Sequence, residues 1–283
     1  MASEIDFKKT RGRPRNTGSG KSTSTVQALD RALELLKLLA EIDEANLTEL
    51  ALRSGMAPST AHRLLVTLQQ QGIVEFDDGT QNWMVGVDAF RIGSSFVRRT
   101  RVVDAGRPVM RELMLATGET ANMARADDGD VVFLSQVETH EAIRAFFRPG
   151  TRGAMHASGI GKALLAEMPR RQVEHILQGK GLETFTAKTL SSPADLFADL
   201  ETTRARGWSI DDEERNVGMR CIAAPIFNAY GEAVAGISIS GPTVRVTDEK
   251  LMEFGPLLKR AAAKVTKAIG GESPARNAES RSD

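Results

Sequence analysis

The segment from Arg15 to Thr23, RNTGSGKST, ends in the glycine, lysine and hydroxyl residue of a phosphate-binding loop. That loop, GxxxxGK(S/T), needs a glycine where this chain has Arg15, and it must follow a buried strand and begin a helix whose amides hold the phosphate. The residues up to Asn16, DFKKTRGRPRN, are too charged for an interior strand. We therefore interpret the segment as a flexible linker and predict no nucleotide site.

Cys221 and His156 could form a thiolate–imidazole pair for nucleophilic catalysis, with Asp211 orienting the histidine. The sequence does not show that these side chains meet, and a small buried thiol beside a hydrogen-bonded histidine is the common alternative. The histidines show no paired metal-ligand spacing; they are His62, His140, His156 and His175. We therefore predict that the protein is not an enzyme and holds no metal or other cofactor.

Polar side chains also gather after Pro58, on a helix that the apolar spacing predicts to end before Gly72. Its predicted buried face consists of Ala61, Leu64, Leu65 and Leu68. Hydroxyl groups bond phosphates or bases, and arginine pairs bidentately with guanine. A helix lying in the major groove of DNA uses such residues. The predicted DNA contacts are Ser59, Thr60, His62, Arg63 and Thr67; a three-helix unit that binds protein is the alternative.

The N-terminal arm is basic, with six basic and no acidic residues from Lys8 to Lys21. Its segment from Arg11 to Arg15, RGRPR, resembles the core of an AT-hook, a motif that lies in narrow A/T minor grooves. Such grooves concentrate negative potential and attract inserted arginine. We predict that Arg11 and Arg13 contact DNA. The alternative is a tail that adds only non-specific affinity and solubility.

The composition is that of a globular protein, with 41% apolar and 26% charged residues among 283. Lys plus Arg and Asp plus Glu both number 37, so net charge indicates no partner. The single cysteine excludes an internal disulfide and fits a reducing compartment. No apolar run approaches the ~20 residues of a membrane span, and the polar N-terminus is not a secretory signal. We expect a cytoplasmic protein.

The first part of the chain has the pattern of a winged helix-turn-helix. A first helix begins near Thr25, and its predicted apolar face is Val26, Leu29, Leu33, Leu36 and Ala40. Thr48 can cap a second helix that Gly55 ends. After the helix at Pro58, strands at Ile73–Phe76 and Trp83–Val85 flank an Asp-Asp-Gly turn. We predict a disordered basic arm at 1–24, this domain at 25–86 and a linker helix at 87–101.

The remainder predicts an α+β domain at 102–271 with a central antiparallel sheet, followed by a disordered tail at 272–283. Two strands flank a turn at Asp128-Gly129. Further strands are predicted at Ala142–Phe147, Trp208–Glu213, Arg220–Phe227 and Ala233–Ser240. Helices are predicted at about 102–117, from Ser158, at 169–178, at 193–207 and from Asp248 to Ile269.

The segment from Gly207 to Asn228, GWSIDDEERNVGMRCIAAPIFN, resembles the signature of the IclR family of bacterial transcription regulators, at a length that makes it highly specific. The resemblance covers about residues 25–270. It implies an N-terminal winged helix, a linker helix and a C-terminal effector domain of GAF-like fold. It also implies a homodimer or homotetramer on a palindromic double-stranded DNA operator.

The segments HRLLVTLQQQG, GSSF, MHASGIGKALLAEM, SIDDEE and ISISGP resemble the acetate-operon, glyoxylate-bypass repressors within that family. This resemblance implies a repressor released by a small 2-oxo acid, with glyoxylate first and pyruvate second, that controls glyoxylate and acetate metabolism. The effector residues that it implies are Gly159, Ile160, Asp211, Cys221, Ser238 and Ser240.

Simple chemistry agrees with this set. Ser238 and Ser240 lie two apart on a predicted strand and so face one side. Gly159 and Ile160 lie at a predicted helix start, where free amides favour a carboxylate. An ionised Asp211 would accept hydrogen bonds from a hydrated aldehyde.

Some positions depart from the subgroup. Ile160 is larger than the residue often found there, and Gly153 and Ala145 are smaller than expected for a pocket wall. Phe146 and Phe147 could fill that space or change selectivity. The alternative function is therefore a family member that answers to aromatic or other carboxylic acids, as a repressor or an activator.

Overall fold

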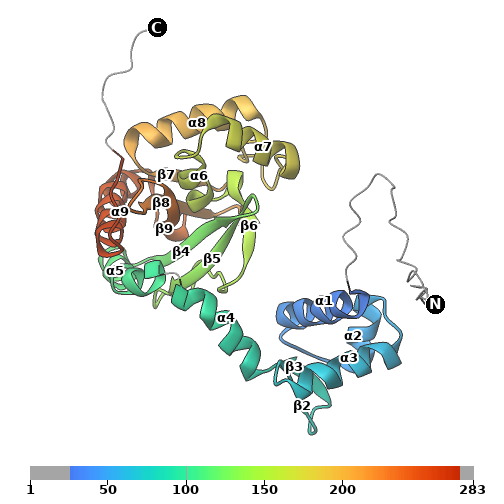
Figure 1. Ribbon diagram of the computed structural model, residues 1–283. Coiled ribbons are helices and arrows are strands. Elements are labelled where there is room, and N and C mark those ends of the chain that lie inside the picture. Colours follow the sequence, from blue (N-terminus) through green and yellow to red (C-terminus); the bar gives the residue numbers. More distant parts are fainter. Residues whose placement is uncertain (1–25, 100, 275–283) are drawn as a thin grey trace, which may run out of the picture. The chain divides into compact units, whose positions relative to one another are not determined.

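The computed structural model describes residues 26–99 and 101–274 (Figure 1). Arg11 and Arg13, the arm at 1–24 and the end of the tail lie outside the described residues, so their predictions stay predictions. Internal packing divides the chain at Gly93, within helix α4 (Val87–Arg99), into an N-terminal and a C-terminal unit.

The N-terminal unit has the predicted winged helix-turn-helix fold. Its elements are α1 (Gln27–Ile42), β1 (Glu44–Asn46), α2 (Leu47–Ser54), α3 (Pro58–Gln70), β2 (Val74–Asp77) and β3 (Asn82–Val85). The three strands form an antiparallel sheet in the order β1-β3-β2. The sequence does not predict β1, because three residues are too few to show a strand period. Helix α2 is capped by Asn46, whose side chain accepts from the Glu49 amide, and not by Thr48 as predicted.

The buried face of α1 differs from the predicted one. Ala32, Leu35 and Leu39 are buried in the core of this unit, whereas Val26, Leu29 and Leu33 are exposed. The leucines of α1 form more than one apolar stripe, so their spacing alone does not select a face. The selection is made by α2 and α3, whose buried residues include Leu50, Ala61 and Leu65. The predicted face of α3 is confirmed, with Ala61 and Leu65 buried and Leu64 and Leu68 partly buried.

The C-terminal unit is built around one antiparallel sheet with the strand order β6-β5-β4-β9-β8-β7. Its elements are α5 (Arg101–Thr117), β4 (Thr120–Asp127), β5 (Asp130–Val137), β6 (Arg152–Ala154), the 3-10 helix η1 (Met155–Ala157), α6 (Gly159–Leu165), α7 (Arg170–Lys180), α8 (Pro193–Arg206), β7 (Ser209–Asp212), β8 (Met219–Phe227), β9 (Ala233–Pro242) and α9 (Asp248–Ala268). The predicted turn joins β4 to β5, with positive φ at Asp128 and Gly129.

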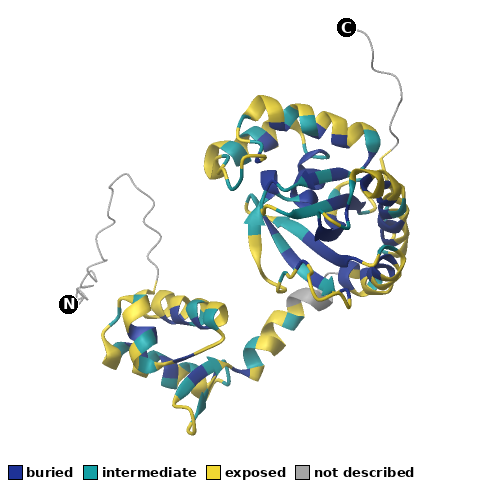
Figure 2. Ribbon diagram, turned by 180° about the vertical axis from the view of Figure 1, so that it is seen from behind, coloured by how far each residue is buried: buried dark blue, intermediate teal, exposed yellow. Residues whose placement is uncertain are grey.

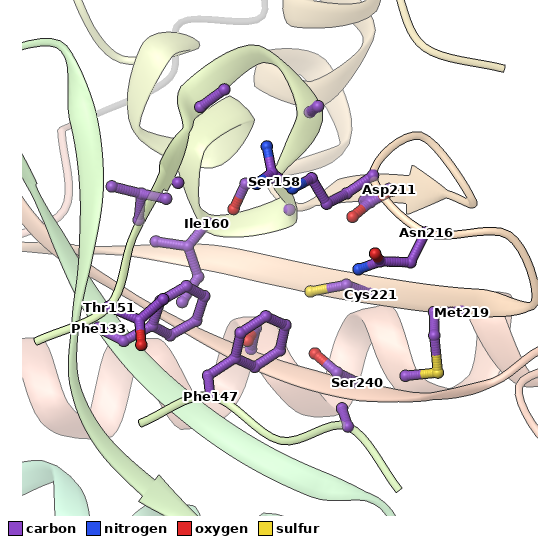
Figure 3. A pocket seen from close by; sticks show the side chains of 18 of the residues that line it. Phe133, Phe147, Thr151, Ser158, Ile160, Asp211, Asn216, Met219, Cys221 and Ser240 are labelled. Carbon is purple, nitrogen blue, oxygen red and sulfur yellow. The ribbon is translucent and has the colours of Figure 1, made fainter. Parts of the chain in front are cut away.

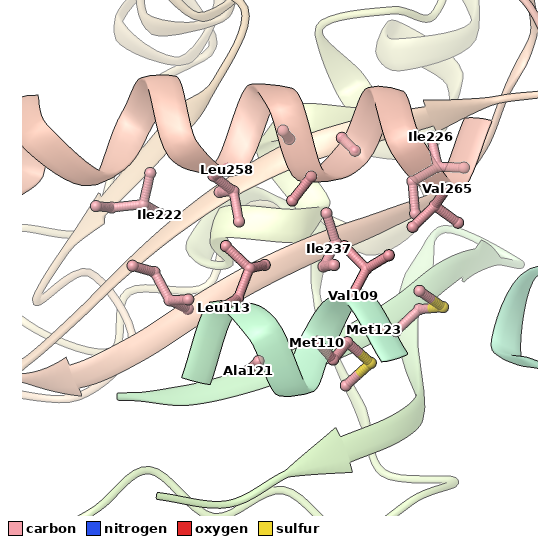
Figure 4. Packing of buried hydrophobic residues seen from close by; sticks show 14 of the residues in the cluster. Val109, Met110, Leu113, Ala121, Met123, Ile222, Ile226, Ile237, Leu258 and Val265 are labelled. Atoms are coloured by element: carbon pink, nitrogen blue, oxygen red, sulfur yellow. The ribbon is translucent and has the colours of Figure 1, made fainter. Parts of the chain in front are cut away.

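Helices cover both faces of this sheet, and the alternation of side chains along its strands creates two apolar cores (Figure 2). Ile222 and Ile226 of β8 and Ile237 of β9 pack with α5 and α9 (Figure 4). Ala223, between them on β8, packs on the other face with α6. That second face carries the candidate site.

The predicted strand at Ala142–Phe147 is wrong, because residues 138–151 form a loop, which we call the pocket loop. Phe133 of β5 already exchanges backbone hydrogen bonds with Gly150 and Thr151, and β6 pairs with β5 just beyond them. Residues 142–147 are thereby left outside the ladder. The alternating apolar side chains of this segment do not share one buried face. Ile143 is exposed, Ala145 is buried, and the Phe147 ring stacks on Phe133.

Leu35→Ala should lower the free energy of unfolding of the N-terminal unit by about 2–5 kcal/mol, because it leaves a cavity in the core. The matched change Leu29→Ala, on the exposed stripe of the same helix, should cost less than about 0.5 kcal/mol. Denaturant titration followed by Trp83 fluorescence, in a Trp208→Phe background, measures both. A larger loss for Leu29→Ala than for Leu35→Ala would show that the predicted face of α1, and not the described one, is buried.

Candidate functional site

The C-terminal unit contains a cavity of about 240 Å³ between α6, the ends of β7, β8 and β9, and the pocket loop (Figure 3). All six effector residues implied by the resemblance line this cavity. They come from three separate parts of the chain: Gly159 and Ile160 from α6, Asp211 and Cys221 from neighbouring strands, and Ser238 and Ser240 from β9.

Strand register brings the polar members together. Asp211 on β7 pairs with Cys221 on β8, and Cys221 pairs with Ser240 on β9, so the three lie in one row across the sheet. Ser238 lies two residues along the same strand and faces the same side. The row thus combines a carboxyl, a thiol and a hydroxyl on the face that also carries Ala223 and, on β4, Thr120 and Asn122.

The two serines differ in their hydrogen bonds. Ser240 Oγ accepts from Asn122 Nδ2 at 3.2 Å, and Gln136 Nε2 donates to Asn122 Oδ1 at 2.8 Å. Ser240 can therefore still donate its own hydrogen to a ligand. Ser238 Oγ is buried and has no hydrogen-bond partner among the residues that the structure describes. Asn122 and Gln136 were not predicted, because they are separated from the serines in the sequence and carry no motif.

The start of α6 approaches the sheet closely. Ser158 caps the helix by accepting from the Gly161 amide, and the Gly159 and Ile160 amides have no backbone acceptor within the described part of the chain. A Cβ at Gly159 would lie 2.7 Å from Cys221 Sγ, so a larger residue there would displace the thiol or the helix. Gly159 and Ile160 both line the cavity, and their predicted contact with a ligand carboxylate stays a prediction.

An apolar wall completes the pocket. The Phe133 and Phe147 rings stack with centroids 4.4 Å apart and planes 3° from parallel. Ile160 is buried beside them, and Ala145 and Gly153 also line the cavity. Phe147 thus supplies the apolar surface that the small residues do not, whereas Phe146 is 56% exposed. Phe147 is one of the departures noted in the sequence, whereas the part of Phe133 in the wall was not predicted.

Burial controls the protonation of the row. Desolvation raises the pKa of Asp211 to about 6, although the Glu214 amide donates to its Oδ1 at 2.9 Å. Burial likewise raises the pKa of Cys221 to about 12, so the thiol stays protonated at neutral pH. His156 Nε2 lies 2.9 Å from the Glu183 carbonyl, and its ring stacks on Phe185. Cys221 therefore lacks the features of an activated nucleophile.

The acidic run at 211–214 is divided where β7 ends at Asp212 and the chain turns at Glu213, which has a positive φ. Asp212 and Glu213 point outward to Lys188, 3.0 and 2.5 Å from its Nζ. Asp211 and Glu214 are buried. The run is therefore only half solvated, and its buried half belongs to the pocket region.

In the N-terminal unit, the five predicted DNA contacts of α3 differ in their surroundings. Ser59, His62, Arg63 and Thr67 are exposed and Thr60 is partly exposed. The His62 ring meets the edge of Trp83 at 6.4 Å, and the Thr67 hydroxyl donates to the Arg63 carbonyl. Ser59 and Arg63 have no such internal bond from their side chains among the described residues.

Comparison with known proteins assigns the chain to a family. A model of the IclR helix-turn-helix domain matches residues 28–78, and a model of the bacterial transcriptional regulator IclR C-terminal domain matches residues 94–267. The chain belongs to the IclR family. It is therefore a transcriptional regulator with a DNA-binding domain, and the IclR-family relatives described below are regulators and not enzymes.

Several IclR-family relatives match nearly the whole chain. The HTH-type transcriptional regulator BhcR of Paracoccus denitrificans is 52% identical over 90% of this chain and 93% of its own. The transcriptional repressor IclR of Escherichia coli is 44% identical and the acetate operon repressor of Salmonella typhimurium 42%, each over 92% of this chain and 96% of its own. The crystal structure of Thermotoga maritima IclR covers 86% of this chain and 98% of its own, with a TM-score of 0.73 and 29% identity.

Within residues 26–99 and 101–274, no three His, Cys, Asp or Glu side chains gather as a metal site would require. No helix in the same residues is both long and apolar enough to cross a membrane.

Asp211→Asn should stabilise the ligand-free protein by about 3 kcal/mol at pH 7.5, because the pKa is raised from 3.8 to about 6 and one unit of pKa corresponds to ~1.4 kcal/mol. The folded pKa of Asp211, about 6, lies above the unfolded value. Ionised Asp211 therefore costs stability above pH 6, and the cost disappears as the pH falls towards ~4. Denaturant titrations between pH 5 and 7.5 measure the gain.

Asp212→Asn is the matched control for this experiment. The Asp212 pKa is lowered, with burial opposing its bonds to Arg220 and Lys188, so its removal should not stabilise the protein at any of these pH values. An Asp211→Asn gain that is as large at pH 5 as at pH 7.5 would contradict the assignment of charge to Asp211.

Proposed function

We propose that this chain is a repressor that leaves its operator when the C-terminal unit binds a small 2-oxo acid, with glyoxylate as the first candidate. The observation that carries the proposal is the row of Asp211, Cys221 and Ser240 beside the amides of Gly159 and Ile160 at the start of α6, all of which line one cavity. The repressed genes would serve glyoxylate and acetate metabolism. The names of two relatives, a transcriptional repressor and an acetate operon repressor, support this direction.

The chemistry of the cavity supports a small oxygen-rich acid. Its volume of about 240 Å³ is below the ~300–1,000 Å³ of pockets for drug-sized ligands. The amides at the start of α6 would hold the carboxylate. Ser238, Ser240 and ionised Asp211 would bind the oxo group or its hydrate, since hydroxyls donate and the carboxylate accepts.

An aromatic or larger carboxylic acid is the second candidate, and with it an activator as the second form of regulation. The stacked Phe133 and Phe147 rings favour this alternative, because they offer a flat apolar surface to a planar ligand. The two candidates differ in which wall of the pocket supplies the binding energy.

For the N-terminal unit, we propose that α3 lies in the major groove, with Ser59, Thr60, His62, Arg63 and Thr67 facing DNA. A homodimer or homotetramer would present two copies of α3 to the halves of a palindromic operator. Arg11 and Arg13 would add contacts in the minor groove. The protein would act in the cytoplasm, where bacterial DNA lies, with the helix at 87–101 linking domains at 25–86 and 102–271.

Calorimetric titration should show saturable glyoxylate binding, with pyruvate weaker or equal. Ser240→Ala should weaken it about 5- to 10-fold, because one hydrogen bond contributes ~1 kcal/mol. Ser135→Ala is the control, since Ser135 is a buried serine of the same sheet outside the pocket lining. Absence of glyoxylate and pyruvate binding, together with binding of benzoate-type acids, would replace the first candidate by the second.

Arg63→Ala should weaken binding to an operator selected from random DNA by about 1–3 kcal/mol and relax the base preference at one position of each half-site. Arg53→Ala is the matched control, because Arg53 is an exposed arginine of α2 that pairs with Glu49. Fluorescence anisotropy at fixed salt measures both. Equal affinities of Arg63→Ala and wild type would show that α3 does not read bases through this residue.

A further inference from the structure

Lys162 of α6 is a fully buried lysine, two residues beyond Ile160 of the pocket wall. Its Nζ lies 2.5 Å from Glu214 Oε1 and 3.2 Å from Asp199 Oδ2 of α8. Burying an ammonium group and carboxylates is costly even when they pair, and an apolar replacement is often as stable. Stability alone therefore gives a weak reason for a lysine at this position.

Glu214 connects Lys162 to the pocket. It lies in the turn of residues 213–218 between β7 and β8, which brings Arg215 and Asn216 to the cavity wall. The Glu214 amide donates to Asp211 Oδ1 at 2.9 Å, while Thr189 Oγ1 donates to the Glu214 carbonyl at 2.6 Å. Glu214 thus has two contacts: its side chain binds Lys162 of α6, and its backbone amide orients Asp211.

We propose that Lys162 is a positioning residue of the effector pocket, which fixes the 213–218 turn through Glu214 and thereby holds the Asp211 side chain at the cavity wall. The inference rests on the proposed function in one respect, namely that the pocket binds an effector. Lys162 itself does not line the cavity. It acts through the placement of Glu214 and through its charge.

The charges around this group are mixed. Lys162 faces Asp199 and Glu214, and Arg206 of α8 interacts with Asp199. Asp211 has Asp212 beside it and Cys221 opposite it on β8. Burial raises the pKa of Asp211 to about 6 and that of Glu214 to about 7, and the Lys162 charge opposes both shifts. Arg215 and Arg220 complete the charged lining on the β8 side of the pocket.

Ionisation of Asp211 decides which group of a ligand it can bind. The carboxylate only accepts hydrogen bonds, so it suits a hydroxyl or a hydrated aldehyde and repels a ligand carboxylate. The protonated acid can donate to that carboxylate. Removing the Lys162 charge should shift Asp211 towards the protonated form and should therefore move the pH dependence of effector binding upward.

The test compares Lys162→Met/Glu214→Gln with wild type, because the double change leaves no unpaired buried carboxylate at position 214. Lys188→Met is the matched control, since Lys188 pairs with Asp212 and Glu213 on the solvent side of the same turn. In the ligand-free protein, amides of residues 213–218 should exchange hydrogen at least 10-fold faster in the double variant and at the wild-type rate in the control.

Titration of the same proteins with glyoxylate from pH 5 to 8 gives the second readout. The midpoint should lie near pH 6 in wild type and in Lys188→Met, and at least half a pH unit higher in the double variant. Asp199→Asn, which removes a competing negative charge and keeps the Glu214 pair, should move the midpoint to lower pH. If the double variant does not fold, the shift of the midpoint in Asp199→Asn tests the effect of charge near Asp211 by itself.

Unchanged exchange in the 213–218 turn would overturn the positioning role. A loosened turn with an unchanged midpoint would show that Lys162 is structural only and would overturn its role in the charge of Asp211. If wild type does not bind glyoxylate, the proposed effector is wrong, whereas the exchange comparison still decides the role of Lys162.

Discussion

The register of β7, β8 and β9 is the constraint on which the rest of the C-terminal unit depends. Because side chains alternate along a strand, one register places Ile222 and Ile237 in the core with α5 and α9, and Cys221 and Ser240 on the opposite face. A slip by one residue would exchange the two sets. The apolar core therefore fixes the position of the polar row, and folding and ligand recognition depend on the same pairing.

The buried polar groups in and around the pocket lower the stability of the fold relative to an apolar pocket. Asp211 and Glu214 are ionisable groups in a buried region, Ser238 has an unpartnered hydroxyl among the described residues, and Lys162 is fully enclosed. Groups of this kind gather where a site must bind charge or switch between states. Their cost is offset by the two cores and by the close approach of α6 at Gly159.

Much of this organisation can be predicted from the sequence. Turn signals and alternation predict the strands β4, β5, β7, β8 and β9, and the resemblance at 207–228 implies the fold and the family. The resemblance of further segments, among them MHASGIGKALLAEM and ISISGP, to one subgroup names six residues that line one cavity. Three features could not be predicted. The buried face of α1 is chosen by its tertiary partners, the expected strand at 142–147 loses its place to Gly150 and Thr151, and Asn122 and Phe133 join the site only through sheet pairing.

The most direct test of the account is the affinity of the full-length protein for its selected operator with and without saturating glyoxylate, in wild type and Ser240→Ala at one salt concentration. The account predicts that glyoxylate weakens operator binding by wild type about 5- to 150-fold, the usual range of allosteric coupling, and that the variant needs more glyoxylate for the same effect. Operator affinity that glyoxylate leaves unchanged, although it occupies the pocket, would contradict the account.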